Sequence, residues 1–355
     1  MRVLITGICG FAGSVIATEL RTQLADVEIV GVDNLSRPGS EINRQRLKAL
    51  GIRVRHGDIR MQSDLESLPR VDWVIDTAAN PSVLAGISGI TSSRQLVEHN
   101  LGGTLEILEL CARQGAGLVM LSTSRVYSIE RMSMIPVAVQ GNRFVPTDEA
   151  FREPGFSAHG VGEEFATDPP LSLYGAAKRA SEVMILEYAR AFGFPAHINR
   201  CGMLSGAGQF GKADQGIISY WIHACCWNQP LTYVGFDGAG HQVRDCLHPR
   251  DLACLIAKQI SGPGASESPL NVSGGIGTAI SLAELTEWCQ RRWGRQYSIG
   301  SSGPRRYDVG WLVLDSSRAR ARWDWEPVME LSGILEEIAS HAESNPGWLE
   351  LSSET

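Results

Sequence analysis

The sequence predicts an α/β protein built on a doubly wound parallel sheet, followed by a smaller mixed α/β domain. Two observations support this prediction. Short runs of branched apolar residues alternate with amphipathic segments through the first 200 residues, and the alternation becomes irregular after Arg200. Continuous Val, Ile and Leu runs are typical of parallel strands that helices cover on both faces, and the alternation favours right-handed βαβ crossovers.

The individual elements follow from these patterns. Buried strands are predicted at residues 3–6, 29–32, 52–55, 73–76 and 118–121, and helices at 14–24, 93–113 and 174–192. Residues 269–272 predict one more short strand, and Ser281 with Glu284 forms the capping box of a helix that runs to Arg292. We expect a first domain over residues 1–200, a second over 201–345, and a polar, frayed tail over 346–355.

Residues 128–172 interrupt the alternation. This segment is rich in Pro, Gly, Phe and Glu, and it is long for a connection within a compact domain. A poorly ordered insert is one interpretation. Because the segment ends just before Tyr174, we favour a lid on the substrate side of the site.

Composition narrows the class of protein. The net charge of −7 disfavours nucleic-acid binding and requires local basic groups for any anionic substrate. The eight cysteines include no Cys-x-x-Cys pair, and no signal or membrane segment precedes the first strand. We therefore expect a cytoplasmic protein with reduced thiols and no membrane partner. The histidines, among them His56, His223 and His248, lack metal-ligand spacing, so no metal site is predicted.

A glycine-rich turn follows the first predicted strand. Gly7, Gly10 and Gly13 allow a tight turn and the close approach of a pyrophosphate, which the N–H groups of the next helix would bind. Asp33 ends the second strand twenty residues beyond Gly13, where its carboxylate can accept both hydroxyls of an adenosine ribose. Together these residues predict a Rossmann-type dinucleotide-binding domain.

The same region favours NAD over NADP as the cofactor. Asp33 would repel a 2′-phosphate, whereas Arg37 could pair with one and so argues in the opposite direction. Asp58 and Ile59 end the third strand, where the acid can reach an adenine amino group. The alternative for Asp58 is a cap on the next helix.

Three side chains form a candidate proton-transfer group. Tyr174 and Lys178 share one helix face, and Thr123 ends a strand on the side of the sheet where ligands bind. The Lys178 ammonium and a positive nicotinamide ring would lower the pKa of Tyr174 towards that of a general base. Thr123 would hydrogen-bond the same substrate hydroxyl, and Lys178 can also hold the nicotinamide ribose. An ordinary surface pair on a helix is the alternative, and the motif set favours oxidation of a secondary alcohol.

Taken in order, these motifs resemble the extended short-chain dehydrogenase/reductase superfamily, and within it the nucleotide-sugar epimerases and dehydratases. The resemblance runs from residue 1 to about 327, and it also includes Gly57-Asp58-Ile59, Asn100-Leu101-Gly102-Gly103-Thr104 and Gln242-Val243-Arg244-Asp245. It implies NAD as the cofactor, a nucleotide-sugar substrate, and a homodimer formed through helices 93–113 and 174–192.

The resemblance also implies the residues of the site. The catalytic residues would be Thr123, Tyr174 and Lys178. The cofactor contacts would be Gly7, Gly10, Phe11, Ala12, Gly13, Asp33, Asn34, Ser36, Arg37, Asp58, Ile59, Ala78, Ala79, Asn100, Tyr174, Lys178 and Cys201. The substrate contacts would be Thr123, Gln209, Phe210, Gln215, Gln242, Arg244, Arg305, Arg306 and Asp308.

The arginines in this set suit a diphosphate, because a guanidinium can bind phosphate oxygens in a bidentate manner. Arg244 and one of Arg305 or Arg306 match phosphate-contacting positions, and a surface salt bridge is the alternative for each. Met203 stands where relatives often carry Asn or Ser for a phosphate contact. That contact is therefore missing or comes from the insert.

Within the superfamily the chain is similar to the CDP-paratose (CDP-tyvelose) 2-epimerases. The similarity lies in Asp33-Asn34-Leu35-Ser36-Arg37, Gly208-Gln209-Phe210, Asp214-Gln215-Gly216 and Gln242-Val243-Arg244-Asp245-Cys246-Leu247-His248. It implies epimerisation at C2 of a CDP-linked deoxyhexose through a transient 2-keto sugar, with internal return of the hydride.

Three other functions stay open. Ser124-Arg125 stands where family dehydratases carry Asp-Glu, which counts against a 4,6-dehydratase. Glu163 or Glu164 could substitute for that pair, although a solvated loop face is the plainer interpretation. A 4-epimerase is a second alternative. A non-catalytic dinucleotide sensor is disfavoured, because such proteins typically lack the Tyr and Lys pair.

Overall fold

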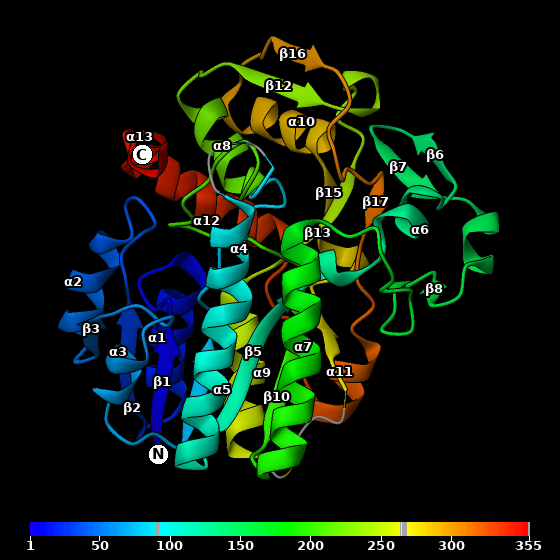
Figure 1. Cartoon of the computed structure of the whole chain (residues 1–355). Helices are drawn as coiled ribbons and strands as arrows, with labels where there is room; N and C mark the ends of the chain where they lie inside the picture. Colours follow the sequence, from blue (N-terminus) through cyan, green and yellow to red (C-terminus); the bar gives the residue numbers. More distant parts are fainter. Residues whose placement is uncertain (88, 90–91, 263, 265–267, 354–355) are drawn as a thin grey trace.

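Seven parallel strands form the large sheet of this computed structural model, which describes residues 1–353 apart from 88, 90–91, 263 and 265–267 (Figure 1). Their order is β14-β10-β5-β4-β1-β2-β3, so the strand order reverses between β1 and β4. The bounds are β1 Arg2–Thr6, β2 Glu28–Asp33, β3 Arg53–His56, β4 Trp73–Asp76, β5 Gly117–Thr123, β10 Ala196–Cys201 and β14 Leu270–Val272. The predicted doubly wound parallel sheet is confirmed.

Helices cover both faces of this sheet, which explains why its strands are apolar throughout. One face packs against α1 Phe11–Gln23, α2 Glu41–Ala49, α9 Pro249–Ser261 and α11 Ser317–Trp323. The other packs against α3 Gln62–Glu66, α5 Gly103–Gln114 and α7 Leu173–Phe192. The predicted helix 93–113 is divided, because a π-helical turn Glu98–Gly102 joins α4 Ser93–Val97 to α5.

A smaller α/β region lies above the carboxyl ends of these strands (Figure 1). Its helices are α8 Ile217–Cys226, α10 Leu282–Trp293, α12 Leu331–Ser344 and α13 Trp348–Ser353. Its strands are β11 Met203–Leu204, β13 Val243–Leu247, β15 Ala279–Ser281 and β17 Trp311–Leu312 in one sheet, and β12 Leu231–Val234 with β16 Ile299–Ser302 in another. The predicted capping box of Ser281 and Glu284 begins α10. Strand β14 belongs to the large sheet and α9 packs against it, although both follow residue 200 in the sequence. The domain division at that residue therefore stays a prediction.

The chain end is folded, so the prediction of a frayed tail is wrong for its described part. Trp348 and Leu349 of α13 are buried, and the Trp348 ring stacks on Phe210 with centroids 5.1 Å apart. The Trp348 indole also donates to the Gln209 carbonyl at 2.9 Å. The apolar side chains of this short helix, Trp348 and Leu349 foremost, are enough to dock it.

Residues 128–172 also fold, so the interpretation as a poorly ordered insert is wrong. They form α6 Ile129–Ser133, the hairpin β6 Val137–Gln140 and β7 Arg143–Pro146, and the short pair β8 Phe156–Ser157 and β9 Gly160–Val161. Phe156 and Phe165 share a buried cluster with Trp311 and Val313 of the smaller region. The Val161 N–H donates to the Val313 carbonyl at 2.9 Å. The role of this segment as a lid stays a prediction.

Candidate active site

Thr123, Tyr174 and Lys178 lie together at the carboxyl end of β5. Thr123 is the last residue of that strand, and the Ser172 hydroxyl caps α7 by accepting the Gly175 N–H at 3.0 Å. This cap places Tyr174 in the first turn of α7, close enough to Thr123 for that side chain to lower the pKa of the phenol by hydrogen bonding. Lys178 follows one turn later, and its Nζ donates to the Leu121 carbonyl at 3.0 Å.

The protonation of Tyr174 differs from the prediction. Burial raises the pKa of Tyr174 to about 12, and its hydrogen bond to Thr123 acts in the opposite direction. The cation that opposes this rise is Arg125, whereas Lys178 has its own pKa lowered, first by burial. Lys178 is not among the groups that shift the pKa of Tyr174 here, and its predicted joint effect with a positive nicotinamide ring stays a prediction.

Arg125 is a site residue that the sequence reasoning missed. Its N–H donates to Thr123 Oγ1 at 3.1 Å, and its half-buried guanidinium donates from Nη1 to the Tyr307 carbonyl at 3.3 Å. Burial and the nearby Arg244 guanidinium lower its pKa, while Asp308 opposes that change. An arginine stays charged at neutral pH despite such a shift. The feature of the sequence that could have indicated a role for Arg125 is its position two residues after Thr123.

The predicted substrate arginines divide into two groups. Arg244 Nη2 lies 3.3 Å from Asp308 Oδ1, and Gln242 Nε2 donates to Asp308 Oδ2 at 3.1 Å. Arg305 acts electrostatically on Arg244 and belongs to the same cluster, which we call the arginine cluster (Arg125, Arg244 and Arg305, with Asp308). Arg306 is exposed. The structure therefore brings Arg305 to the site and turns Arg306 towards solvent.

Side chains of the loop at residues 209–216, which were predicted to line the substrate pocket, make contacts within the protein. Phe210 is 3% exposed and stacks on Trp348, so its ring is part of the core. Gln209 Nε2 donates to the Leu204 carbonyl at 2.8 Å. Arg37 crosses from the loop after β2 to bind Gln215 Oε1 and the Phe210 carbonyl. Arg37 thus ties the predicted cofactor loop to the predicted substrate loop, and this leaves it poorly placed to select a 2′-phosphate.

The glycine turn after β1 has the shape that a dinucleotide needs. Gly7 has a φ of +60°, and a Cβ there would lie 2.9 Å from Ala78 Cα in the segment after β4. A Cβ on Gly13 would lie 2.4 Å from the Gly7 carbonyl oxygen. Helix α1 begins at Phe11 with no side-chain cap and no acidic residue in its first turn. The backbone N–H groups of Phe11, Ala12 and Gly13, in the first turn of this helix, are therefore suited to bind a pyrophosphate.

Asp33 ends β2 beside this turn. Its carboxylate accepts the Cys9 N–H and the Leu35 N–H, both at 2.8 Å, and burial raises its pKa. A carboxylate has about four lone-pair sites, so both oxygens can still accept ribose hydroxyls. Asn34 accepts the Ser36 N–H at 3.0 Å and so shapes the loop next to Asp33.

Asp58 lies next to this loop but does not cap a helix. Its carboxylate binds Arg60 in a bidentate manner, at 2.9 and 2.6 Å, and accepts from Asn34 Nδ2 at 3.2 Å. The hydrogen bond with Arg60 is the main reason why the pKa of Asp58 is lowered. The following helix begins at Gln62 without a side-chain cap. The alternative of a cap is therefore wrong, and an adenine contact stays a prediction.

Three further predicted cofactor residues surround the strand ends. Asn100 lies in the π-helical turn, and its side chain exchanges two hydrogen bonds, at 2.8 and 3.0 Å, with the backbone of Asn80, directly after Ala79. Such turns are frequent at functional sites. Cys201 ends β10 beside Thr123 and is buried. Ile59, by contrast, packs close to Gly103, so its side chain supports α5.

The two glutamates that could serve a dehydratase lie elsewhere. The Glu163 side chain is 7% exposed and accepts the Asn271 N–H at 2.9 Å, whereas Glu164 is exposed and pairs with Arg318 at 3.3 Å. The solvated-face interpretation is confirmed for Glu164 and is wrong for Glu163. Both carboxylates form structural contacts with other parts of the chain, which disfavours a catalytic acid or base at either position.

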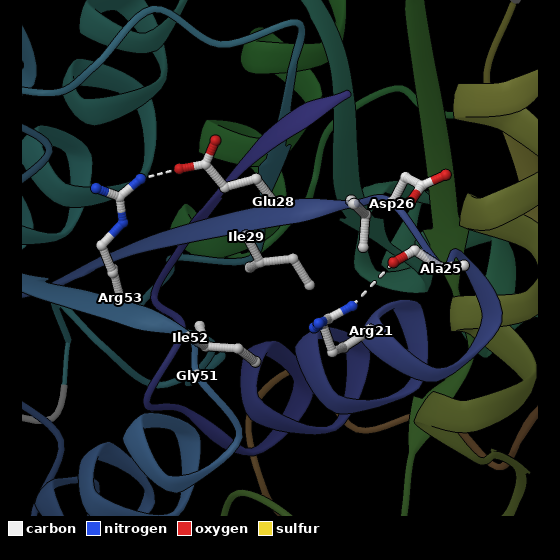
Figure 2. A pocket seen from close by; sticks show the side chains of 9 residues that line it. Arg21, Ala25, Asp26, Glu28, Ile29, Gly51, Ile52 and Arg53 are labelled. Carbon is white, nitrogen blue, oxygen red and sulfur yellow. Dashed lines mark hydrogen bonds and ion pairs between the residues drawn. The ribbon is translucent and has the colours of Figure 1, made fainter.

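A pocket elsewhere on the surface, shown in Figure 2, has no connection with these groups. It is lined by Arg21, Glu28 and Arg53 among others, where β2 and β3 begin. In this architecture ligands bind at the opposite, carboxyl ends of the strands. Across the described ranges, no cluster of three or more His, Cys, Asp or Glu side chains could hold a metal ion. No described helix combines the length and apolar character needed to cross a membrane.

Comparison with known proteins agrees with this geometry. Residues 3–272 match the family model of the NAD dependent epimerase/dehydratase family. The chain belongs to this family. NAD is accordingly its cofactor, as the glycine turn and Asp33 predicted.

Relatives in this family align with most of the length of this chain. The CDP-paratose 2-epimerase of Salmonella typhi is 28% identical, covering 92% of this chain and 95% of the relative. The UDP-glucuronate 4-epimerase of Thermodesulfobacterium geofontis is 24% identical, covering 96% of both. Among solved structures, the dTDP-glucose 4,6-dehydratase DesIV of Streptomyces venezuelae, a double mutant with NAD and DAU bound, has a TM-score of 0.82. It is 24% identical, covers 99% of this chain and is itself covered completely, so the fold is shared over the whole length.

Proposed function

We propose that the protein is an NAD-dependent epimerase that inverts C2 of a CDP-linked dideoxyhexose. The observation that carries the proposal is the phenol of Tyr174, placed next to the Thr123 side chain at the carboxyl end of β5. The choice of CDP-paratose as substrate is supported by the similarity to the Salmonella enzyme. The choice of an epimerase over a dehydratase is supported by Ser124 and Arg125 directly after Thr123, since neither is a carboxylic acid.

Each residue would have one task. Bound NAD would supply the hydride chemistry, so that the sugar carbon could be oxidised and then reduced again. Tyr174, as phenolate, removes the proton of the C2 hydroxyl and gives it back to the oxygen at the end of the cycle. Thr123 donates a hydrogen bond to that phenolate and orients the hydroxyl. The 2-keto sugar turns before the hydride returns, so the configuration at C2 is inverted.

Lys178 and the glycine turn would hold the cofactor. Lys178 Nζ has three donors, of which the Leu121 carbonyl takes one, so two remain for ribose hydroxyls. Asp33 would accept the adenosine ribose hydroxyls, and the N-terminus of α1 would bind the pyrophosphate.

Incubation with CDP-paratose in deuterated water tests the proposal. We expect CDP-tyvelose with unchanged mass and no deuterium at C2, because the hydride is recycled internally. Solvent deuterium at C2 would instead indicate enolisation, and a product lighter by one water would indicate a dehydratase. UDP-glucose and UDP-glucuronate serve as competing substrates, because 4-epimerases for both sugars share this fold. Turnover of either, with none of CDP-paratose, would refute the C2 assignment.

A further inference from the structure

Arg125 joins the proton-transfer group to the arginine cluster. Its backbone N–H donates to Thr123 Oγ1 at 3.1 Å, and the oxygen of its carbonyl lies against Gly175, next to Tyr174. Its guanidinium donates to the carbonyl of Tyr307 at 3.3 Å and also acts electrostatically on the Tyr174 phenol. Tyr307 precedes Asp308, the carboxylate that pairs with Arg244. One side chain therefore spans the distance between the catalytic phenol and the cluster.

Most of the donors on this guanidinium are unused. Arginine carries five N–H donors, and within the described part of the chain the Arg125 side chain makes one hydrogen bond. The side chain is only half-buried, so the remaining donors can reach a ligand. Tyr307 adopts a φ of 61°, a left-handed conformation that is rare for a bulky residue and is found mainly at functional sites.

The charges of the cluster do not balance within the chain. Arg125, Arg244 and Arg305 bring three positive charges, against which stand Asp308, paired with Arg244, and Asp245, which also acts electrostatically on Arg244. A diphosphate esterified at both ends is an anion that would offset the remaining positive charge. Bidentate guanidinium contacts are the usual way to bind such groups.

We propose that Arg125 binds the sugar-side phosphate of the nucleotide sugar and so holds the carbon next to the anomeric carbon against Tyr174. This inference rests on the proposed function and names the residue that selects C2. In a pyranosyl diphosphate, C2 is bonded directly to the carbon that bears the phosphate, whereas C4 lies across the ring. A phosphate held by Arg125, two residues from Thr123, places C2 close to the phenol and C4 far from it.

Nucleotide binding tests the phosphate contact independently of catalysis. The probes are CDP, UDP, dTDP and GDP, titrated calorimetrically into the NAD-loaded protein, and the monophosphate of whichever base binds. Loss of one charge-assisted contact corresponds to roughly tenfold or more in affinity. We expect Arg125→Gln to weaken the diphosphate by that factor and the monophosphate by less than twofold. Equal weakening of both nucleotides, or of neither, would overturn the phosphate contact.

Two further variants keep this test decisive. Arg125→Lys retains the charge without the planar guanidinium, so we expect an intermediate loss of affinity for the diphosphate alone. If Arg125→Gln does not fold, this variant tests the phosphate contact in its place. The exposed Arg291→Gln, on α10, is the matched control and should leave both affinities unchanged.

Isotope effects test the choice of carbon. With a substrate that turns over, deuterium at C2 should slow the reaction and deuterium at C4 should not. An effect at C4 alone would refute the proposed selection of C2, even if the nucleotide titrations show the phosphate contact. Absence of turnover with every nucleotide sugar would refute the proposed function, while the diphosphate and monophosphate titrations would still decide whether Arg125 binds the phosphate.

Discussion

The carbonyl oxygen of Arg125 occupies the space in which a side chain at position 175 would begin. A Cβ built on Gly175 would lie 2.1 Å from that oxygen, well inside contact distance. The first turn of α7 can therefore approach the end of β5 only because residue 175 is glycine. This approach brings Tyr174 to Thr123.

Gly175→Ala should separate these two groups. Because backbone atoms cannot yield as a flexible side chain can, we expect overpacking to destabilise the fold by about 1–3 kcal/mol. A displacement of about 1 Å in the site would lower kcat by about a hundredfold. Thermal melting and steady-state kinetics measure the two effects.

Gly333→Ala is the matched control for that change. Gly333 is likewise the third residue of its helix, α12, but a Cβ there would meet only the end of Met329 at 3.8 Å. Alanine is favoured over glycine in helices by about 1 kcal/mol, so this variant should be as stable as the parent or more so. Equal damage from both substitutions would contradict the role of the close approach.

Tyr174→Phe should remove the general base and leave the fold intact. We expect kcat to fall by about 10²–10⁴-fold, with bound NAD unchanged. The phenolate is the active form, and burial raises the pKa of Tyr174 to about 12. The rate of the parent enzyme should therefore rise with pH below that pKa, and the rise should vanish in the variant. Tyr188→Phe, on the exposed part of the same helix, should change neither the rate nor its pH dependence.

Arg37→Gln tests the connection between the two loops. Since the Arg37 guanidinium binds the Phe210 carbonyl and Gln215, its removal should free the loop at residues 209–216 and raise KM for the nucleotide sugar by about tenfold. The NAD content, measured after denaturation, should stay the same. A loss of NAD with unchanged KM would instead favour the cofactor contact that the family resemblance implied. Arg44→Gln, an exposed change on α2, is the control.

Val183→Glu tests the expected homodimer. Helices α4 and α7 pack against each other and expose Val97 and Val183 by 39% and 45%. Solvent-exposed apolar side chains on adjacent helices suit an interface. We expect a dimer for the parent and a monomer for the variant by size-exclusion chromatography with light scattering. Val139→Glu, at a position on β6 that is 57% exposed and lies outside both helices, should leave the oligomeric state unchanged.

The sequence by itself determined the large sheet, the glycine turn and the shared location of Tyr174 and Lys178 on one helix. Each of these depends on short-range patterns: apolar runs for strands, glycine spacing for the turn, and a four-residue interval for Tyr174 and Lys178. Such patterns are visible without knowledge of distant contacts.

The tertiary structure decided what depends on contacts between distant residues. Arg37 was predicted at the cofactor, yet it binds a loop more than 170 residues away. Phe210 was predicted to line the substrate pocket, yet it stacks on a helix at the chain end that was expected to fray. Arg125 had no assigned role until the fold placed Arg244, Arg305 and Asp308 around it. The charge and packing of a side chain depend on all neighbours in space, and the linear pattern records only those along the chain.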